Sequence, residues 1–267
     1  MIDGHVHIER GPYTEEWIME FVKKAQERNI HKLYLLEHSH RFKEFKGLYD
    51  SIIEADGCSE LQKQWLASKS TVSLKEYKDL ILEMRRKKLP IEVKFGLEIC
   101  YFPEKEEYIK STTSDFNWDF LTGSIHWIDG WGFDHPKTKD LWEHKDINHI
   151  YEKYYNLMIK LVESKLFNIL AHPDSIKCFN YYPKKDISYL YEKLALSLKE
   201  NNLKAEFSNG LFINYSHIEL GMNKKLLKIL MDNDVEIVTA SDAHTPHDVG
   251  RYIKEANKIL NQLNRTE

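Results

Sequence analysis

Two histidines near the N-terminus, His5 and His7, are spaced to act together as metal ligands. They stand two residues apart in the segment IDGHVHI, which we predict to be a strand. Side chains at positions i and i+2 of a strand point to the same face. On its own, this pair does not distinguish a metal site from two ordinary core histidines.

Six more potential ligands fall on or just after other predicted strands, near their carboxyl ends. They are His38 after KLYLLE, Glu98 within KFGLEIC, His126 after TGSI, His172 after NILA, and Asp242 and His244 after VTAS. A parallel barrel gathers its active site at the carboxyl ends of its strands, so these side chains should meet the histidine pair at one mouth. Five of the other histidines are interpreted as surface or core residues: His31, His135, His144, His149 and His217.

Imidazole and carboxylate ligands suit Mn, Fe, Zn or Co. Eight of them exceed the three or four protein ligands of one catalytic zinc ion. The pattern therefore predicts a multinuclear centre in which Glu98 or Asp242 bridges two ions. Such a pair supplies hydroxide at neutral pH and holds both oxygens of an in-line displacement, which indicates a hydrolase and above all a phosphoesterase. Asp242 and His244 are both candidates for protonating the leaving alkoxide.

Short apolar runs alternate with amphipathic stretches along the chain, as in successive βα units of a parallel sheet. The predicted strands are 2–8, 32–36, 93–100, 119–125, 168–171, 204–207 and 236–239. The predicted helices are 15–28, 74–87, 147–165, 186–200, 223–232 and 247–263, the first two capped by Thr14 and Ser73. No linker interrupts the 267 residues, so we predict one α/β barrel domain over 1–267, with a helical insertion around 62–71.

Charge, hydropathy and cysteine content argue against several classes of partner and location. The net charge of −4 argues against a general nucleic-acid coat. No stretch approaches the roughly 20 apolar residues that span a bilayer, and the N-terminus has no signal-peptide pattern. The three cysteines are scattered and form no disulfide framework. We therefore expect a cytoplasmic protein with no nucleic-acid or membrane partner.

Seven segments, in order, resemble the PHP (polymerase and histidinol phosphatase) superfamily, and most closely its histidinol-phosphatase branch. They are DGHVH, LLEHS, FGLEICY, GSIHW, LAHPD, EFSNGLF and ASDAHTPHDVGR, and they run from residue 3 to residue 251. The resemblance implies a distorted (βα)7, TIM-like barrel with two or three divalent metal ions that hydrolyses phosphate esters. It implies a first ion held by His5, His7, Glu98 and Asp242, a second sharing Glu98 and using His126, and His38, His172 and His244 as the remaining ligands.

One position departs from that family pattern. Relatives usually carry another His, Asp or Glu a few residues after the histidine pair, as a ligand of a third ion. Here Tyr13 stands where that ligand is expected, and a neutral tyrosine with a pKa of about 10 is a poor substitute. Glu9 and Glu15 are the nearby carboxylates that can replace it.

The resemblance also implies a small phosphate ester as substrate, with L-histidinol phosphate first. Arg251 matches a position that the phosphatase branch uses, and its guanidinium suits phosphate oxygens. Further candidates for the mouth of the site are His40, Arg41 and Asn209. The aromatic residues that are candidates to line it are Tyr101, Trp127, Trp131 and Phe133. The alternatives are a PHP-type protein-tyrosine phosphatase, an amidohydrolase-type metallohydrolase that does not need Arg251, and a non-catalytic metal-binding domain.

Overall fold

Seven parallel strands form a nearly closed barrel in the computed structural model, which describes residues 1–263. Their order around the sheet is β1 (Ile2–His7), β2 (Lys32–Leu36), β3 (Glu92–Cys100), β4 (Phe120–Ser124), β7 (Ile169–Leu170), β8 (Lys204–Ser208) and β9 (Ile237–Ala240). The two outer strands meet where the backbone N–H of His7 donates to the carbonyl of Ala243 at 2.7 Å. The predicted (βα)7 barrel is therefore confirmed, whereas residues 264–267 of the predicted domain lie outside the described part.

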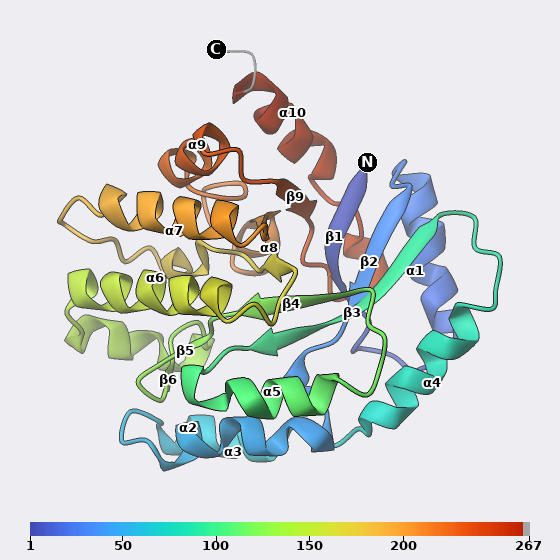
Figure 1. The fold of residues 1–267 in the computed structure, drawn as a ribbon, viewed down its shortest axis with the longest axis horizontal. Coiled ribbons are helices and arrows are strands. Elements are labelled where there is room, and N and C mark those ends of the chain that lie inside the picture. The colour runs from blue at the N-terminus through green and yellow to red at the C-terminus, as the bar shows by residue number, and fades with distance from the viewer. Residues whose placement is uncertain (264–267) are drawn as a thin grey trace.

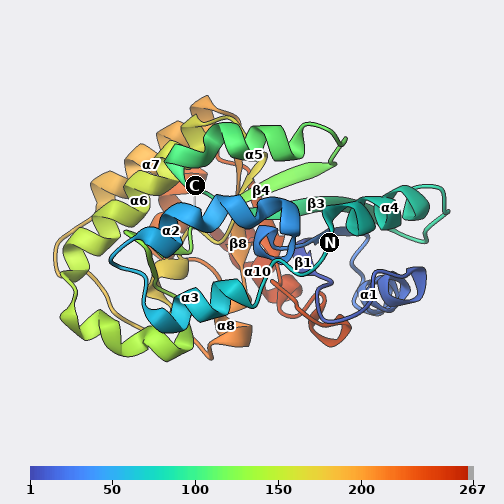
Figure 2. The ribbon, with the colours of Figure 1, turned by 90° about the horizontal axis from the view of Figure 1, so that it is seen from below.

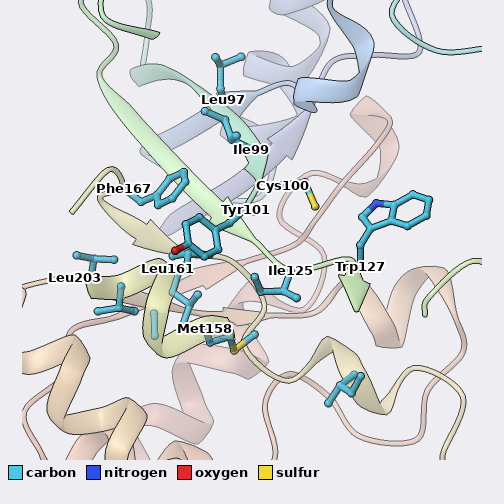
Figure 3. Packing of buried hydrophobic residues seen from close by; sticks show 14 of the residues in the cluster. Leu97, Ile99, Cys100, Tyr101, Ile125, Trp127, Met158, Leu161, Phe167 and Leu203 are labelled. Carbon is cyan, nitrogen blue, oxygen red and sulfur yellow. The ribbon is translucent and has the colours of Figure 1, made fainter. Parts of the chain in front are cut away.

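Helices cover the outside of this barrel (Figure 1). They include α1 (Glu15–Glu27), α4 (Leu74–Met84), α5 (Glu106–Thr113), α6 (Ile147–Glu163), α7 (Ser188–Glu200), α9 (Lys224–Asp232) and α10 (Ile253–Leu263). Thr14 and Ser73 cap α1 and α4 as predicted, each accepting a hydrogen bond from a backbone N–H of its helix. In Figure 3, Met158 and Leu161 of α6 lie against Ile125 and Tyr101, so an apolar face of this helix closes the core.

The segments that follow the carboxyl ends of the strands are long and build one end of the molecule. After β2 come the 3-10 turns Ser39–Arg41 and Lys43–Tyr49 and the helices α2 (Asp50–Glu54) and α3 (Glu60–Ala67), which lie over one end of the barrel in Figure 2. This is the predicted insertion, longer than 62–71. The short hairpin β5 (Trp127–Ile128) and β6 (Trp131–Gly132) follows β4, and α8 (Gly210–Asn214) follows β8.

Local backbone geometry explains where the predicted elements were wrong. The helix predicted from residue 247 begins only at Ile253, because Gly250 and Tyr252 have positive φ angles of 74° and 59° that interrupt it. The hairpin was missed although Asp129 and Gly130 are the residues that a tight hairpin turn favours, and both have positive φ. Helix α5 was missed because its last residues, Ser-Thr-Thr, are weak helix formers.

No helix among residues 1–263 is long and apolar enough to cross a membrane.

A buried carboxylate, Asp3, ties the first strand to the chain that follows the last one. It accepts hydrogen bonds from the backbone N–H and hydroxyl of Ser241 at 2.8 and 2.6 Å, and from the N–H of Gly250 at 2.7 Å. Burial raises its pKa to about 6 while these donors act in the opposite direction, so the group is ionised at neutral pH. Beside it, only a glycine fits at position 4, because a Cβ there would lie 2.3 Å from Val238.

Replacing Asp3 with alanine should lower the free energy of unfolding by about 2–4 kcal/mol, because three buried donors lose a charged acceptor. Urea unfolding followed by circular dichroism measures this change. Asp79→Ala is the matched control, since Asp79 is exposed and pairs with Lys75 on the same helix, and it should change stability by less than about 1 kcal/mol. Equal small effects of the two substitutions would show that Asp3 does not hold the barrel closed.

Candidate metal centre

A cavity of about 520 Å³ opens at the carboxyl ends of the strands. Six of the eight predicted ligands line it: His38, Glu98, His126, His172, Asp242 and His244. The other two, His5 and His7, are fully buried directly beside them on β1. The structure thus brings together all eight side chains, which come from six different strands and the turns after them.

Glu98 stands at the centre of this cluster. Its Oε1 lies 3.0 Å from Nε2 of His126 and 3.1 Å from Nε2 of His172. Its Oε2 lies 3.2, 3.4 and 3.5 Å from Nε2 of His38, His7 and His5 respectively. One carboxylate facing imidazoles on both of its oxygens has the geometry that a bridging ligand requires.

The remaining ligands stack around His7. Its ring lies 3.9 Å from that of His38 and 4.5 Å from that of His244, and its Nε2 is 3.6 Å from Oδ1 of Asp242. Asp242 adopts a positive φ of 55°, a conformation that costs energy for a non-glycine residue. A Cβ at Gly210 would lie 2.0 Å from its carboxylate, so glycine is needed there for Asp242 to keep this position.

The chemistry of these side chains fits divalent cations. The side chains form four overlapping groups, and within each group the ligand atoms lie within 4.8 Å of one another. The groups are His5, His7 and Glu98; His7, His38 and His244; Glu98, His126 and His172; and Glu9, His38 and His40. The nitrogens that face Glu98 are Nε2 of His7 and of His172, at 3.4 and 3.1 Å, and their Nδ1 atoms have no hydrogen-bond partner among residues 1–263. Burial and the neighbouring His38 and His244 lower the pKa of His7 well below its usual value, which favours the neutral imidazole that binds metals.

Two carboxylates that the sequence analysis missed hold the histidine rings in place. Oε1 of Glu206 lies 2.8 Å from Nδ1 of His5, and its Oε2 accepts the backbone N–H of His172 at 3.1 Å. Oδ2 of Asp134 lies 2.6 Å from Nδ1 of His126. Such contacts fix the tautomer and orientation of ligand histidines. A charged residue inside the buried strand KAEFS was the available signal for Glu206; nothing in the sequence marked Asp134.

The position expected to hold a further ligand behaves as its residue type suggests. Tyr13 does not line the metal cavity; it faces Glu37 and Arg41 on another side of the barrel. Glu15 is paired with Lys87 at the surface. Glu9, in contrast, lines the cavity, with Oε2 3.2 Å from Nδ1 of His38 and Oε1 3.7 Å from Nε2 of His244.

The predicted substrate-binding residues divide into two groups. His40 lines the cavity. Arg251 and Asn209 are not among the described residues that line it: the Arg251 guanidinium donates to Asp248 at 2.7 Å, and the Asn209 amide donates to the carbonyl of Arg251 at 3.3 Å. The cations that do line the cavity are Arg10, Lys69 and Lys177, none of which was singled out from the sequence.

Of the four aromatic residues predicted to line the mouth, Trp127 lines the cavity, whereas Tyr101, Trp131 and Phe133 are buried in the core. His135, which was interpreted as a surface or core residue, lines the cavity instead.

Comparison with known proteins assigns the family. Residues 3–210 match the PHP domain, which covers most of the chain. The chain belongs to the PHP domain family. Two relatives assigned as histidinol-phosphatases are similar in sequence. The protein from Deinococcus radiodurans is 28% identical over 173 residues, 65% of either chain, and the protein from Schizosaccharomyces pombe is 26% identical over 215 residues, 72% of this chain and 68% of the relative.

Solved structures of similar fold agree with this family. A protein from Listeria monocytogenes assigned as the histidinol phosphatase HisK superposes with a TM-score of 0.76 at 17% identity, covering 95% of this chain and 99% of its own. The histidinol phosphate phosphatase HisK from Lactococcus lactis, solved with Zn, L-histidinol and phosphate, has a TM-score of 0.69 at 16% identity, covering 98% and 93%. At these identities the likeness shows that the barrel fold is shared.

Replacing Glu206 with glutamine should weaken metal binding by about 10- to 100-fold, because His5 loses the carboxylate that orients its ring. Retained metal, measured by mass spectrometry after dialysis against buffered free zinc, reports the change. Glu236→Gln is the matched control, since Glu236 is exposed and pairs with Lys204, the first residue of the strand β8 that carries Glu206. Unchanged metal retention in the Glu206 variant would exclude this role.

Proposed function

We propose that this PHP protein is a metal-dependent phosphomonoesterase that converts L-histidinol phosphate and water to L-histidinol and phosphate. The observation that carries the proposal is the cluster of eight imidazole and carboxylate ligands around Glu98 in a cavity of small-molecule size. Both curated relatives are assigned to this activity, and the Lactococcus protein was solved with the two products. The chain matches 65% of the length of the Deinococcus relative, and the histidinol-phosphatase activity of the whole protein is therefore a proposal.

The ligand set would serve two or three ion positions. His5, His7, Glu98 and Asp242 would hold one ion, and Glu98 with His126 and His172 a second. His38 and His244, together with Glu9, would hold a third. Two or three divalent ions of Mn, Fe, Zn or Co suit this donor set. When bound, they polarise the phosphoryl oxygens and provide a nucleophile at neutral pH.

The chain's own side chains supply the remaining tasks. Asp242 and His244 are each about one-fifth exposed and line the cavity, and both stay candidates for protonating the leaving oxygen of the ester. Asp242 would donate from Oδ2, the oxygen that does not face His5 and His7, whereas His244 would donate from Nε2 only where that atom does not hold an ion. Arg10 lines the same cavity and would contact phosphate oxygens, and His40, predicted to bind substrate, lines it as well. A phosphate contact by Arg251, our prediction from the sequence, requires its guanidinium to leave Asp248, and Asn209 would act through that same segment.

Phosphate release from a panel of esters tests the activity. The protein is loaded separately with Mn, Fe, Zn and Co, its metal content is measured, and L-histidinol phosphate, phosphotyrosine and a phosphotyrosine peptide are compared. We expect L-histidinol phosphate to give the highest kcat/KM. Preference for the phosphopeptide would favour a tyrosine phosphatase, and no release from any ester with any ion would contradict a phosphatase altogether.

Within the same assay, Asp242→Asn should reduce kcat by at least about 100-fold, because a group acting at the reacting phosphate is lost. Asparagine tolerates the positive φ of this position, so the fold should survive. Asp234→Asn is the control, since Asp234 has a similar φ of 59° but is exposed and pairs with Lys199. Near-normal activity of metal-replete Asp242→Asn would exclude Asp242 from the reaction.

Glu9 and Tyr13 can be separated by metal content. Glu9→Gln should lower the number of tightly bound ions by one, because it removes the carboxylate beside His38 and His244. Tyr13→Phe should leave metal content unchanged, since Tyr13 lines a different cavity with Arg41 and does not line the metal cavity. The measurement is metal per protein at a series of buffered concentrations. Loss of an ion in Tyr13→Phe, with none lost in Glu9→Gln, would reverse the assignment.

A further inference from the structure

One wall of the cavity is built from three rings that do not contact Glu98, of which His40 alone belongs to a possible ligand group, with Glu9 and His38. Trp65 of α3 lies with its ring centroid 5.0 Å from that of His40 and 6.0 Å from that of His135, to which it is nearly perpendicular. We call these three side chains the aromatic wall. Nζ of Lys69 lies 4.8 Å from the indole centroid. All four side chains line the cavity, so the wall faces the space that a substrate would occupy.

The aromatic wall begins one ring away from the metal cluster. The His40 ring lies 4.7 Å from the ring of His38, which in turn contacts Glu98. A phosphoryl group held at the cluster therefore places its ester substituent within reach of Trp65. The indole is half-buried and open to the cavity, unlike the core tryptophans Trp131 and Trp142, which are 1% exposed.

A carboxylate for a cationic group lies next to this wall. Asp134 directly precedes His135 and lines the cavity. Its Oδ2 contacts His126, and among residues 1–263 no side chain donates a hydrogen bond to its Oδ1, which is available as an acceptor. Other carboxylates of the cavity outside the ligand groups are held by partners: Glu206 by His5, and Asp174 by Lys177.

We infer that the aromatic wall is the subsite for the leaving group, and that Trp65 selects phosphate esters whose alcohol carries a flat ring, with an amine placed at Asp134. The inference rests on the proposed function and concerns the alcohol part of the substrate, which the metal cluster would not contact. An indole offers a large rigid surface to another ring, and such contacts favour aromatic partners beyond their buried area. An ester without a ring does not make this contact, and the indole then contacts the Lys69 ammonium that lies over it.

Comparison of two esters in Trp65→Ala tests the inference. L-Histidinol phosphate carries the ring and the amine, whereas O-phosphoethanolamine carries only the amine. We expect kcat/KM for the ring-bearing ester to fall by about tenfold, which corresponds to about 1.4 kcal/mol, and mainly through KM. The value for O-phosphoethanolamine should change by less than about twofold, and Trp65→Phe should restore most of the preference. An equal loss for both esters would mean that Trp65 only supports the fold, and would overturn the inference.

Trp118→Ala is the matched control, because Trp118 is also partly buried but packs on Phe116 and Tyr77 outside the cavity. It should leave the ratio of the two esters unchanged. Calorimetric binding of L-histidinol and ethanolamine to the metal-loaded protein adds a readout that does not need turnover. A preference for L-histidinol that is lost in Trp65→Ala supports the subsite even if no ester is hydrolysed, in which case the proposed activity alone fails. No preference in the wild-type protein overturns the subsite.

Discussion

The structure depends on keeping one carboxylate, Glu98, charged at the buried end of a strand. A buried carboxylate without partners is costly, and its pKa would rise. Burial acts in that direction here, but His38 and the other imidazoles around both of its oxygens outweigh it and hold the pKa of Glu98 well below its usual range. The barrel supplies these partners because parallel strands end on one side, so that residues far apart in sequence arrive at one point.

The contacts that close the barrel also bring the ligand side chains of its first and last strands together. The backbone N–H of Asp242 donates to the carbonyl of His5, so the segment that follows the last strand is fixed directly to the first histidine of the pair. Asp3 reinforces that junction two residues earlier. Strain at Asp242 is thereby held by hydrogen bonds on both sides of it, which is how a local conformational cost persists at a functional site.

Most of the barrel and the ligand cluster could be predicted because both follow from local patterns. Strands read as short apolar runs, and ligands such as His38 and His172 stand directly at strand ends, where the topology alone decides that they meet. The parts that were missed are those with weak local signals. Asp134, for example, lies in a loop. The substrate contact of Arg251 was predicted from its motif position and stays a prediction; its guanidinium donates to Asp248, three residues away.

The sequence by itself determined the fold class, the family and the eight side chains that come together around Glu98, because strand periodicity and residue type carry that information. Only the tertiary structure decided how these side chains are supported and what surrounds them. Glu9 rather than Tyr13 faces the cluster, Glu206 braces His5, and Trp65 from the insertion lines the cavity. Those contacts join segments separated by tens to hundreds of residues, and their side-chain directions depend on packing that no local pattern encodes.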